Sequence, residues 1–155
     1  TAWTLQGLWV FLTLCAALAA ITTREPAALG LRDVVGLLIW ASGFIIELLA
    51  DRQKSAHREA HPGRFIDSGL WAWSRHPNYF GEIVLWVGVA VIASSTLRGW
   101  QYLTMISPVF VVFLLTRVSG IPILEKRADE SWGGQPDYER YKSQTPVLLP
   151  RPPRR

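Results

Sequence analysis

Residues 3–21, WTLQGLWVFLTLCAALAAI, contain no charged side chain. A bilayer core about 30 Å thick takes roughly 20 helical residues, so this stretch is long enough to cross it. A helix of a soluble bundle would instead need a polar face at the helical period, and this stretch has none. It therefore predicts a membrane-spanning helix.

Three further apolar stretches follow at residues 34–50, 83–97 and 100–116. The stretch 34–50 carries only Glu47, and 100–116 contains Pro108, which kinks a membrane helix without forbidding it. Charged residues make up only 18% of the chain, below the roughly 25% of a soluble domain. We therefore predict an all-α fold, a polytopic bundle of four transmembrane helices with short cytoplasmic helices.

The basic residues orient this bundle. Of the 16 Lys and Arg residues, only Arg24, Arg32 and Arg98 fall in the connections after the first and third helices. All others fall after the second or the fourth helix, which places the long loop and the C-terminal part in the cytoplasm. The net charge of +4 suits a membrane surface or a phosphate-bearing ligand. We expect a lipid bilayer as a partner and no nucleic acid.

The chain divides into a membrane-embedded domain, residues 1–145, and a tail rich in Pro and Arg, residues 146–155. Because the first residue is Thr1 and the first apolar stretch begins almost at once, we expect a piece of a longer protein. Neither His57 nor His61 has a Cys or His partner at metal spacing, so we predict no metal site.

One candidate site follows the second apolar stretch. Residues 47–61, ELLADRQKSAHREAH, contain no Gly or Pro, so the helix should continue past the membrane boundary as far as Pro62. Asp51, Lys54 and Arg58 would then share one helical face. This face is either a solvated basic surface against anionic lipid or a clamp for a phosphate, and spacing alone does not choose between them.

The densest group of polar residues is GLWAWSRHPNYFGE, residues 69–82. Pro77 suits a first helical position, so a helix should begin there. Arg75, Asn78, Tyr79 and Glu82 would line one side of that helix start, which attracts anions. The alternative is that Arg75 simply pairs with Glu82 while Asn78 caps the helix.

A series of motifs runs along the chain: TLQG (4–7), DRQK (51–54) with Arg58, GLW (69–71), RHPNYFGE (75–82), SGIP (119–122) with Glu125, and YERY (138–141). In these motifs the chain resembles the C-terminal, NADPH-binding part of the steroid 5-alpha-reductase family, and most of all its bacterial branch of unassigned membrane proteins. Sterol C14 and delta-7 reductases are similar at Gln53, Lys54 and Arg58. Isoprenylcysteine methyltransferases resemble the RHP-x-Y segment.

The resemblance implies NADPH as the cofactor, with Lys54 and Arg58 at its 2′-phosphate. Tyr79 and Glu82 are implied as catalytic residues, and Tyr79 and Gln6 as candidates to polarise a carbonyl. The implied cofactor-binding residues are Asp51, Lys54, Arg58, Trp71, Arg75, His76, Asn78, Tyr79, Glu82, Arg117, Glu125, Tyr138 and Tyr141.

The implied reaction is hydride transfer to the β-carbon of a lipophilic enone, such as a steroid or sterol, by a multi-pass protein of the bacterial inner membrane. The family's substrate-binding helices precede this region, so they are missing from the chain or supplied by a partner subunit.

The first alternative is a methyltransferase of the isoprenylcysteine type that uses S-adenosylmethionine. S-adenosylmethionine has no phosphate for Lys54 and Arg58 to bind. Methyltransferases of this type also carry two adjacent acidic residues where this chain has Glu125 and Lys126. The second alternative is a non-catalytic subunit that binds a nucleotide.

Overall fold

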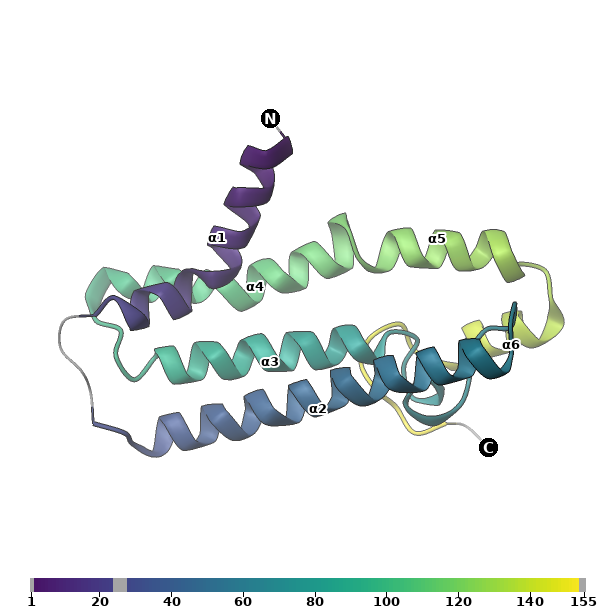
Figure 1. Ribbon diagram of the computed structural model, residues 1–155, viewed down its shortest axis with the longest axis horizontal. Helices are drawn as coiled ribbons and strands as arrows, with labels where there is room; N and C mark the ends of the chain where they lie inside the picture. Colours follow the sequence, from purple (N-terminus) through teal and green to yellow (C-terminus); the bar gives the residue numbers. More distant parts are fainter. Residues whose placement is uncertain (1, 24–27, 154–155) are drawn as a thin grey trace. The chain divides into compact units, whose positions relative to one another are not determined.

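The computed structural model describes residues 2–23 and 28–153, and every regular element within these ranges is helical (Figure 1). The α-helices are α1 (Ala2–Ile21), α2 (Leu31–Ala60), α3 (Pro77–Ala93), α4 (Ile106–Phe113), α5 (Ile121–Trp132) and α6 (Pro136–Gln144). Three other helical segments are the 3₁₀-helices η1 (Gly69–Ala72) and η2 (Gly99–Met105) and the π-helix η3 (Leu114–Val118). The all-α prediction is confirmed for the described residues.

Three helical segments of the described chain are long and apolar enough to cross a membrane: Trp3–Ile21, Leu31–Ala60 and Gly99–Trp132. The remaining predicted span, residues 83–97, corresponds to α3, which has 17 residues. At 1.5 Å per residue it is about 25 Å long, short of a bilayer core of about 30 Å. The prediction of four spans is therefore not confirmed, whereas the apolar helices do indicate a membrane protein.

The described residues form two compact units, and the first comprises 1–43 and 83–114 apart from the undescribed positions. In this unit α1 packs against η2 and α4 around a small core of Ala16, Ala93 and Leu97. The thiol of Cys15 donates to the carbonyl of Thr104 at 3.1 Å, and the hydroxyl of Ser107 donates to the carbonyl of Thr13. These bonds link α1 to the later helices.

Within the first unit α2 and α3 approach closely at two glycines. A Cβ at Gly36 would lie 2.8 Å from the amide nitrogen of Ile92, and one at Gly88 would lie 2.7 Å from Cα of Trp40. Any larger residue would push the backbones apart, since small residues are what let membrane helices approach closely.

The stretch 100–116 is not one kinked helix, which corrects the prediction. It passes from η2 through α4 into η3, so its backbone changes between 3₁₀, α and π forms. Pro108 lies in the first turn of α4, where an amide has no partner within the helix, so it breaks no bond there.

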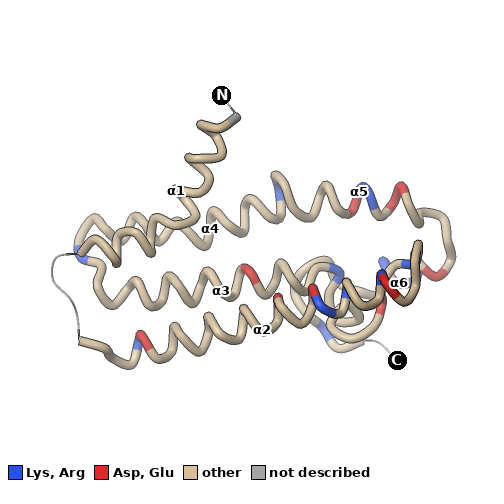
Figure 2. The backbone as a smooth tube through the Cα atoms, in the orientation of Figure 1, with Lys and Arg blue, Asp and Glu red and all other residues tan. Residues whose placement is uncertain are grey.

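The second unit comprises residues 44–82 and 115–153, and it carries the candidate site. As predicted, α2 continues past its apolar stretch and ends at Ala60, just before Pro62, and α3 begins at Pro77. Figure 2 shows that the charged residues of α2 lie near its start and again over its C-terminal half, from Glu47 onward. Most of the charged residues of α2 thus lie in its C-terminal half.

Candidate functional site

The 3₁₀-helix η1 is fixed on α2 by residues of the DRQK and GLW motifs. The side-chain carbonyl of Gln53 accepts a hydrogen bond from the amide of Leu70 at 2.9 Å. Gly69 has φ +60°, and a Cβ there would lie 2.5 Å from Oε1 of Gln53, so only glycine allows this approach. The indole of Trp71 donates to the carbonyl of Ala50 at 3.0 Å. Gln53, Gly69 and Trp71 therefore set the position of the loop that follows.

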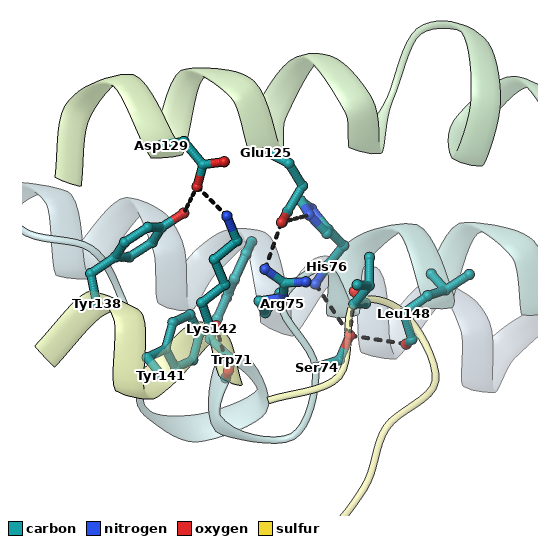
Figure 3. Close-up of polar contacts among 11 residues, drawn as sticks. Trp71, Ser74, Arg75, His76, Glu125, Asp129, Tyr138, Tyr141, Lys142 and Leu148 are labelled. Atoms are coloured by element: carbon teal, nitrogen blue, oxygen red, sulfur yellow. Dashed lines mark hydrogen bonds and ion pairs between the residues drawn. The ribbon is translucent and has the colours of Figure 1, made fainter. Parts of the chain in front are cut away.

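Glu125 of α5 holds both basic residues at the start of α3 (Figure 3). Its Oε2 lies 2.6 Å from Nη1 of Arg75, and its Oε1 lies 2.7 Å from Nε2 of His76. The side chains of Arg75 and Glu125 are 11% and 21% exposed, so the ion pair is largely shielded from water. The alternative that Arg75 pairs with Glu82 is therefore wrong, since its partner is Glu125.

We call the contacts of Glu125 with Arg75 and His76 the Glu125 clamp. It leaves one buried nitrogen without a partner on each of these two residues. Nε of Arg75 and Nδ1 of His76 are buried and have no hydrogen-bond partner among the described residues. A carboxylate only accepts hydrogen bonds, so Nε2 of His76 carries the proton and donates a hydrogen bond to Glu125. Nδ1 then accepts a hydrogen bond when the ring is neutral and donates one when it is charged. Buried polar groups of this kind are normally satisfied, which suits a bound ligand.

The two tyrosines of α6 are tied to different elements (Figure 3). The hydroxyl of Tyr138 donates to Asp129 at 3.0 Å, and Nζ of Lys142 lies 2.5 Å from the same carboxylate oxygen. The hydroxyl of Tyr141 donates to the carbonyl of Trp71 at 2.8 Å, which joins α6 to η1. Burial raises the pKa of Tyr138 above its usual range, and its bond to Asp129 raises it further. Burial likewise raises the pKa of Tyr141, so both phenols remain protonated at neutral pH.

A cavity of about 370 Å³ lies among these elements. Eight of the site residues predicted from the sequence line this cavity: Lys54, Arg58, Trp71, Arg75, His76, Glu125, Tyr138 and Tyr141. Its remaining lining residues are His57, Gly63, Arg64, Phe65, Ile66, Leu124, Arg127, Ala128, Ser131 and Trp132. Glu125 is the only carboxylate among the described lining residues, and Arg75 already neutralises it. The cavity is therefore positively charged and has aromatic walls.

A second hollow of about 630 Å³ shares several lining residues with this cavity, Tyr141 and Phe65 among them. Tyr141 is also the only one of the predicted site residues among its described lining residues. The smaller cavity is therefore the better candidate, because the predicted residues converge on it rather than on the larger hollow.

Five predicted site residues do not line the smaller cavity: Asp51, Asn78, Tyr79, Glu82 and Arg117. Asp51 and Arg117 are exposed, on α2 and η3. Tyr79 stacks on His76 with ring centroids 5.7 Å apart. Glu82 makes no hydrogen bond or ion pair within the described part of the chain, and Oδ1 of Asn78 is buried without a partner there. The roles predicted for these residues stay predictions.

Several residues around the cavity were not among the predicted site residues. Arg64 and Arg127 add two cations, and Phe65 packs on Tyr141 with ring centroids 5.5 Å apart. The basic side chain of Lys54 lies over the ring of Trp71, 5.1 Å from its centroid, a cation–π contact. Arg64 and Phe65 follow the end of α2 within a few residues, which is the one signal in the sequence that could have pointed to them.

Tyr141→Phe is expected to lower the free energy of unfolding by about 1 kcal/mol, because the carbonyl of Trp71 loses its donor. The expected fall in melting temperature is about 2–4 °C, measured by intrinsic fluorescence in detergent. Tyr138→Phe is the matched control on the same helix, and we expect a smaller fall because Asp129 keeps Lys142 as a partner. Equal falls in the two variants would contradict the anchoring role of Tyr141.

Comparison with known proteins places the chain in a family. The model of a family described as proteins of unknown function, DUF1295, matches residues 1–145, nearly the whole chain. The chain belongs to this family. The match includes all helices of both units and every lining residue of the cavity.

Two relatives are more distant. An uncharacterized protein of Schizosaccharomyces pombe, C594.04c, is 26% identical over 169 residues, which cover 94% of this chain and 47% of that protein. The 3-oxo-5-alpha-steroid 4-dehydrogenase 1 of Bos taurus is 32% identical over 73 residues, or 46% of this chain and 28% of the enzyme. The chain thus spans less than half the length of either relative. No solved structure matches it.

These relatives support the resemblance to steroid 5-alpha-reductases in part. The similarity to the bovine enzyme is distant and covers less than half of the chain. Together with the apolar helices, it indicates a membrane protein related to an oxidoreductase family.

Proposed function

We propose that the chain is the cofactor-binding part of a membrane reductase that uses NADPH to reduce a lipophilic enone. The observation that carries the proposal is the positively charged, aromatic-walled cavity of about 370 Å³ in the second unit. A dinucleotide needs cations for its phosphates and flat apolar walls for its rings, and this lining offers both. The distant similarity to a 3-oxo-5-alpha-steroid 4-dehydrogenase supports a nicotinamide cofactor.

The residues present fit this cofactor. We assign the 2′-phosphate to Lys54 and Arg58, which lie one turn apart on α2 and both line the cavity. Arg64 and Arg127 supply further positive charge for the pyrophosphate. Arg75 and His76 also line the cavity, and Glu125 holds them there, so a polar ligand would meet two side chains in fixed positions. A methyl donor without phosphate would leave these cations without partners.

When bound, NADPH supplies a hydride. The protein's own residues must orient the reactants and donate a hydrogen bond to the carbonyl oxygen of the enone. Glu125 holds Arg75 and His76 in fixed positions, so these two side chains are preorganised before any ligand enters. We assign to the hydroxyl of Tyr79 the donation of a hydrogen bond to the carbonyl oxygen of the enone. Glu82, one turn further along α3, is assigned to hold a polar group of the reactants.

The domain and its setting are proposed with the function. Residues 1–145 form the membrane-embedded cofactor domain, in a bacterial inner membrane with the site facing the cytoplasm. The basic residues after the second and fourth apolar stretches support this orientation. The chain spans less than half the length of these relatives. The proposal assigns the enone site to a preceding segment or a partner subunit.

The test is to titrate the purified protein in nanodiscs with NADPH, NADH and S-adenosylmethionine. Trp71 and Trp132 line the cavity, so quenching of tryptophan fluorescence should follow binding. We expect NADPH to bind at least about tenfold more tightly than NADH, as one charge-assisted hydrogen bond can give. S-adenosylmethionine should not bind. Binding of S-adenosylmethionine without NADPH would favour the methyltransferase. NADPH binding with no oxidation by a steroid enone, even when the preceding segment is present, would favour the non-catalytic subunit.

A further inference from the structure

The loop before α3 has backbone groups that cannot be satisfied within a helix. Residues 73–76 connect η1 to α3, and Pro77 disfavours the helical conformation for His76. Polar backbone groups in a packed region need partners from somewhere in the chain. For the amide of Arg75 and the carbonyl of Trp73, those partners come from the far end of the sequence.

The partners are residues 146–151, which we call the C-terminal segment. The amide of Arg75 donates to the carbonyl of Pro146 at 2.9 Å, and the amide of Arg151 donates to the carbonyl of Trp73 at 2.9 Å. The two stretches therefore run in opposite directions, because the later residue of one pairs with the earlier residue of the other. The C-terminal segment is held along the loop that carries Arg75 and His76.

Ser74 lies between these two backbone bonds and is fully buried, with 0% exposure. Its hydroxyl donates to the carbonyl of Leu148 at 2.9 Å, and the same oxygen accepts from the amide of His76 at 3.2 Å (Figure 3). A single hydroxyl thus joins the C-terminal segment to the backbone of His76. The imidazole of that residue is held at its other end by Glu125.

We propose that the C-terminal segment is a structural part of the cofactor site and that Ser74 is the residue that positions His76 through it. The proposal rests on the proposed function, because His76 matters to a ligand only if the cavity binds one. Glu125 fixes the imidazole, but it cannot fix the backbone from which the imidazole extends. Ser74 and the C-terminal segment fix that backbone, and with it the direction of Nδ1 of His76.

Two full-length variants test this link. Ser74→Ala removes the shared hydroxyl, and Arg151→Pro removes the amide that donates to Trp73. Each has a matched control: Ser143→Ala, whose hydroxyl bonds only within α6, and Arg151→Ala, which keeps the backbone amide. The measurements are hydrogen exchange of residues 73–76, the imidazole NMR signals of His76 and NADPH affinity, all in nanodiscs.

We expect amide exchange at Arg75 and His76 to rise about tenfold in both test variants, the effect of one lost hydrogen bond. The imidazole signals of His76 should shift in Ser74→Ala, and NADPH affinity should fall by about three- to tenfold. Both controls should match the wild type in all three measurements. A merely structural role for Ser74 would leave the His76 signals and NADPH affinity unchanged.

Unchanged exchange in both test variants would overturn the proposal. Faster exchange with wild-type NADPH affinity and unmoved His76 signals would overturn the positioning role of Ser74. If the wild type binds no NADPH, the proposed function fails instead. In that case the exchange rates and the His76 signals still decide whether the C-terminal segment positions the loop.

Discussion

Replacing Lys54 and Arg58 together by alanine is expected to weaken NADPH binding by about 100-fold, since each charge-assisted contact contributes about tenfold or more. Affinity for NADH should change by less than about twofold, because only the 2′-phosphate loses its partners. Both side chains line the cavity and lie one turn apart on α2. Fluorescence titration of the two nucleotides against wild type and variant measures the effect.

The control is Arg52→Ala, which removes one positive charge from the same helix, whereas the double variant removes two. Arg52 is exposed and does not line the cavity, so its removal should leave both affinities unaltered. An equal loss of NADPH and NADH affinity in the double variant would mean that the two residues stabilise the site rather than recognise the phosphate. A comparable loss in Arg52→Ala would mean that net charge alone attracts the nucleotide.

Glu125→Ala is expected to lower the stability of the second unit strongly. It removes the shared partner of Arg75 and His76 and leaves a largely buried guanidinium without a counter-charge. Breaking such a pair from one side costs about 3 kcal/mol, or roughly 10 °C in melting temperature. NADPH affinity should fall as well, because Arg75 and His76 then lose their fixed positions.

Glu130→Ala on the same helix is the control for this change. Glu130 pairs with Lys126 at 3.9 Å, and both side chains are exposed to solvent. Exposed ion pairs contribute little, so the melting temperature should stay within about 2 °C of the wild type. If Glu125→Ala is as stable as Glu130→Ala, the clamp on Arg75 and His76 contributes nothing to the fold.

Much of the helical structure follows from the sequence, because it depends on local properties. Residues 3–21 have no polar face, so a helix there has to lie in lipid or in a core. Pro62 and Pro77 bound the loop between α2 and α3, since proline stops one helix and starts the next. The shared face of Lys54 and Arg58 follows from helical spacing alone.

The partners of these residues could not be read from spacing. Helical periodicity relates positions a few residues apart, so it offered Glu82, and then only as an alternative, as a partner of Arg75. The true partner, Glu125, lies 50 residues away along the chain. The same holds for Arg64 and Arg127, which reach one cavity from separate elements.

The helical class, the apolar helices and the start of α3 at Pro77 could all be predicted from the sequence, since each depends on neighbouring residues. The contacts of Glu125 with Arg75 and His76, and the course of residues 146–151 along residues 73–75, are seen in the tertiary structure alone. The physical reason is that these contacts satisfy a charge and backbone groups that local structure leaves unpaired. Which distant segment supplies the missing partner depends on how the elements pack, and packing has no local pattern in the sequence.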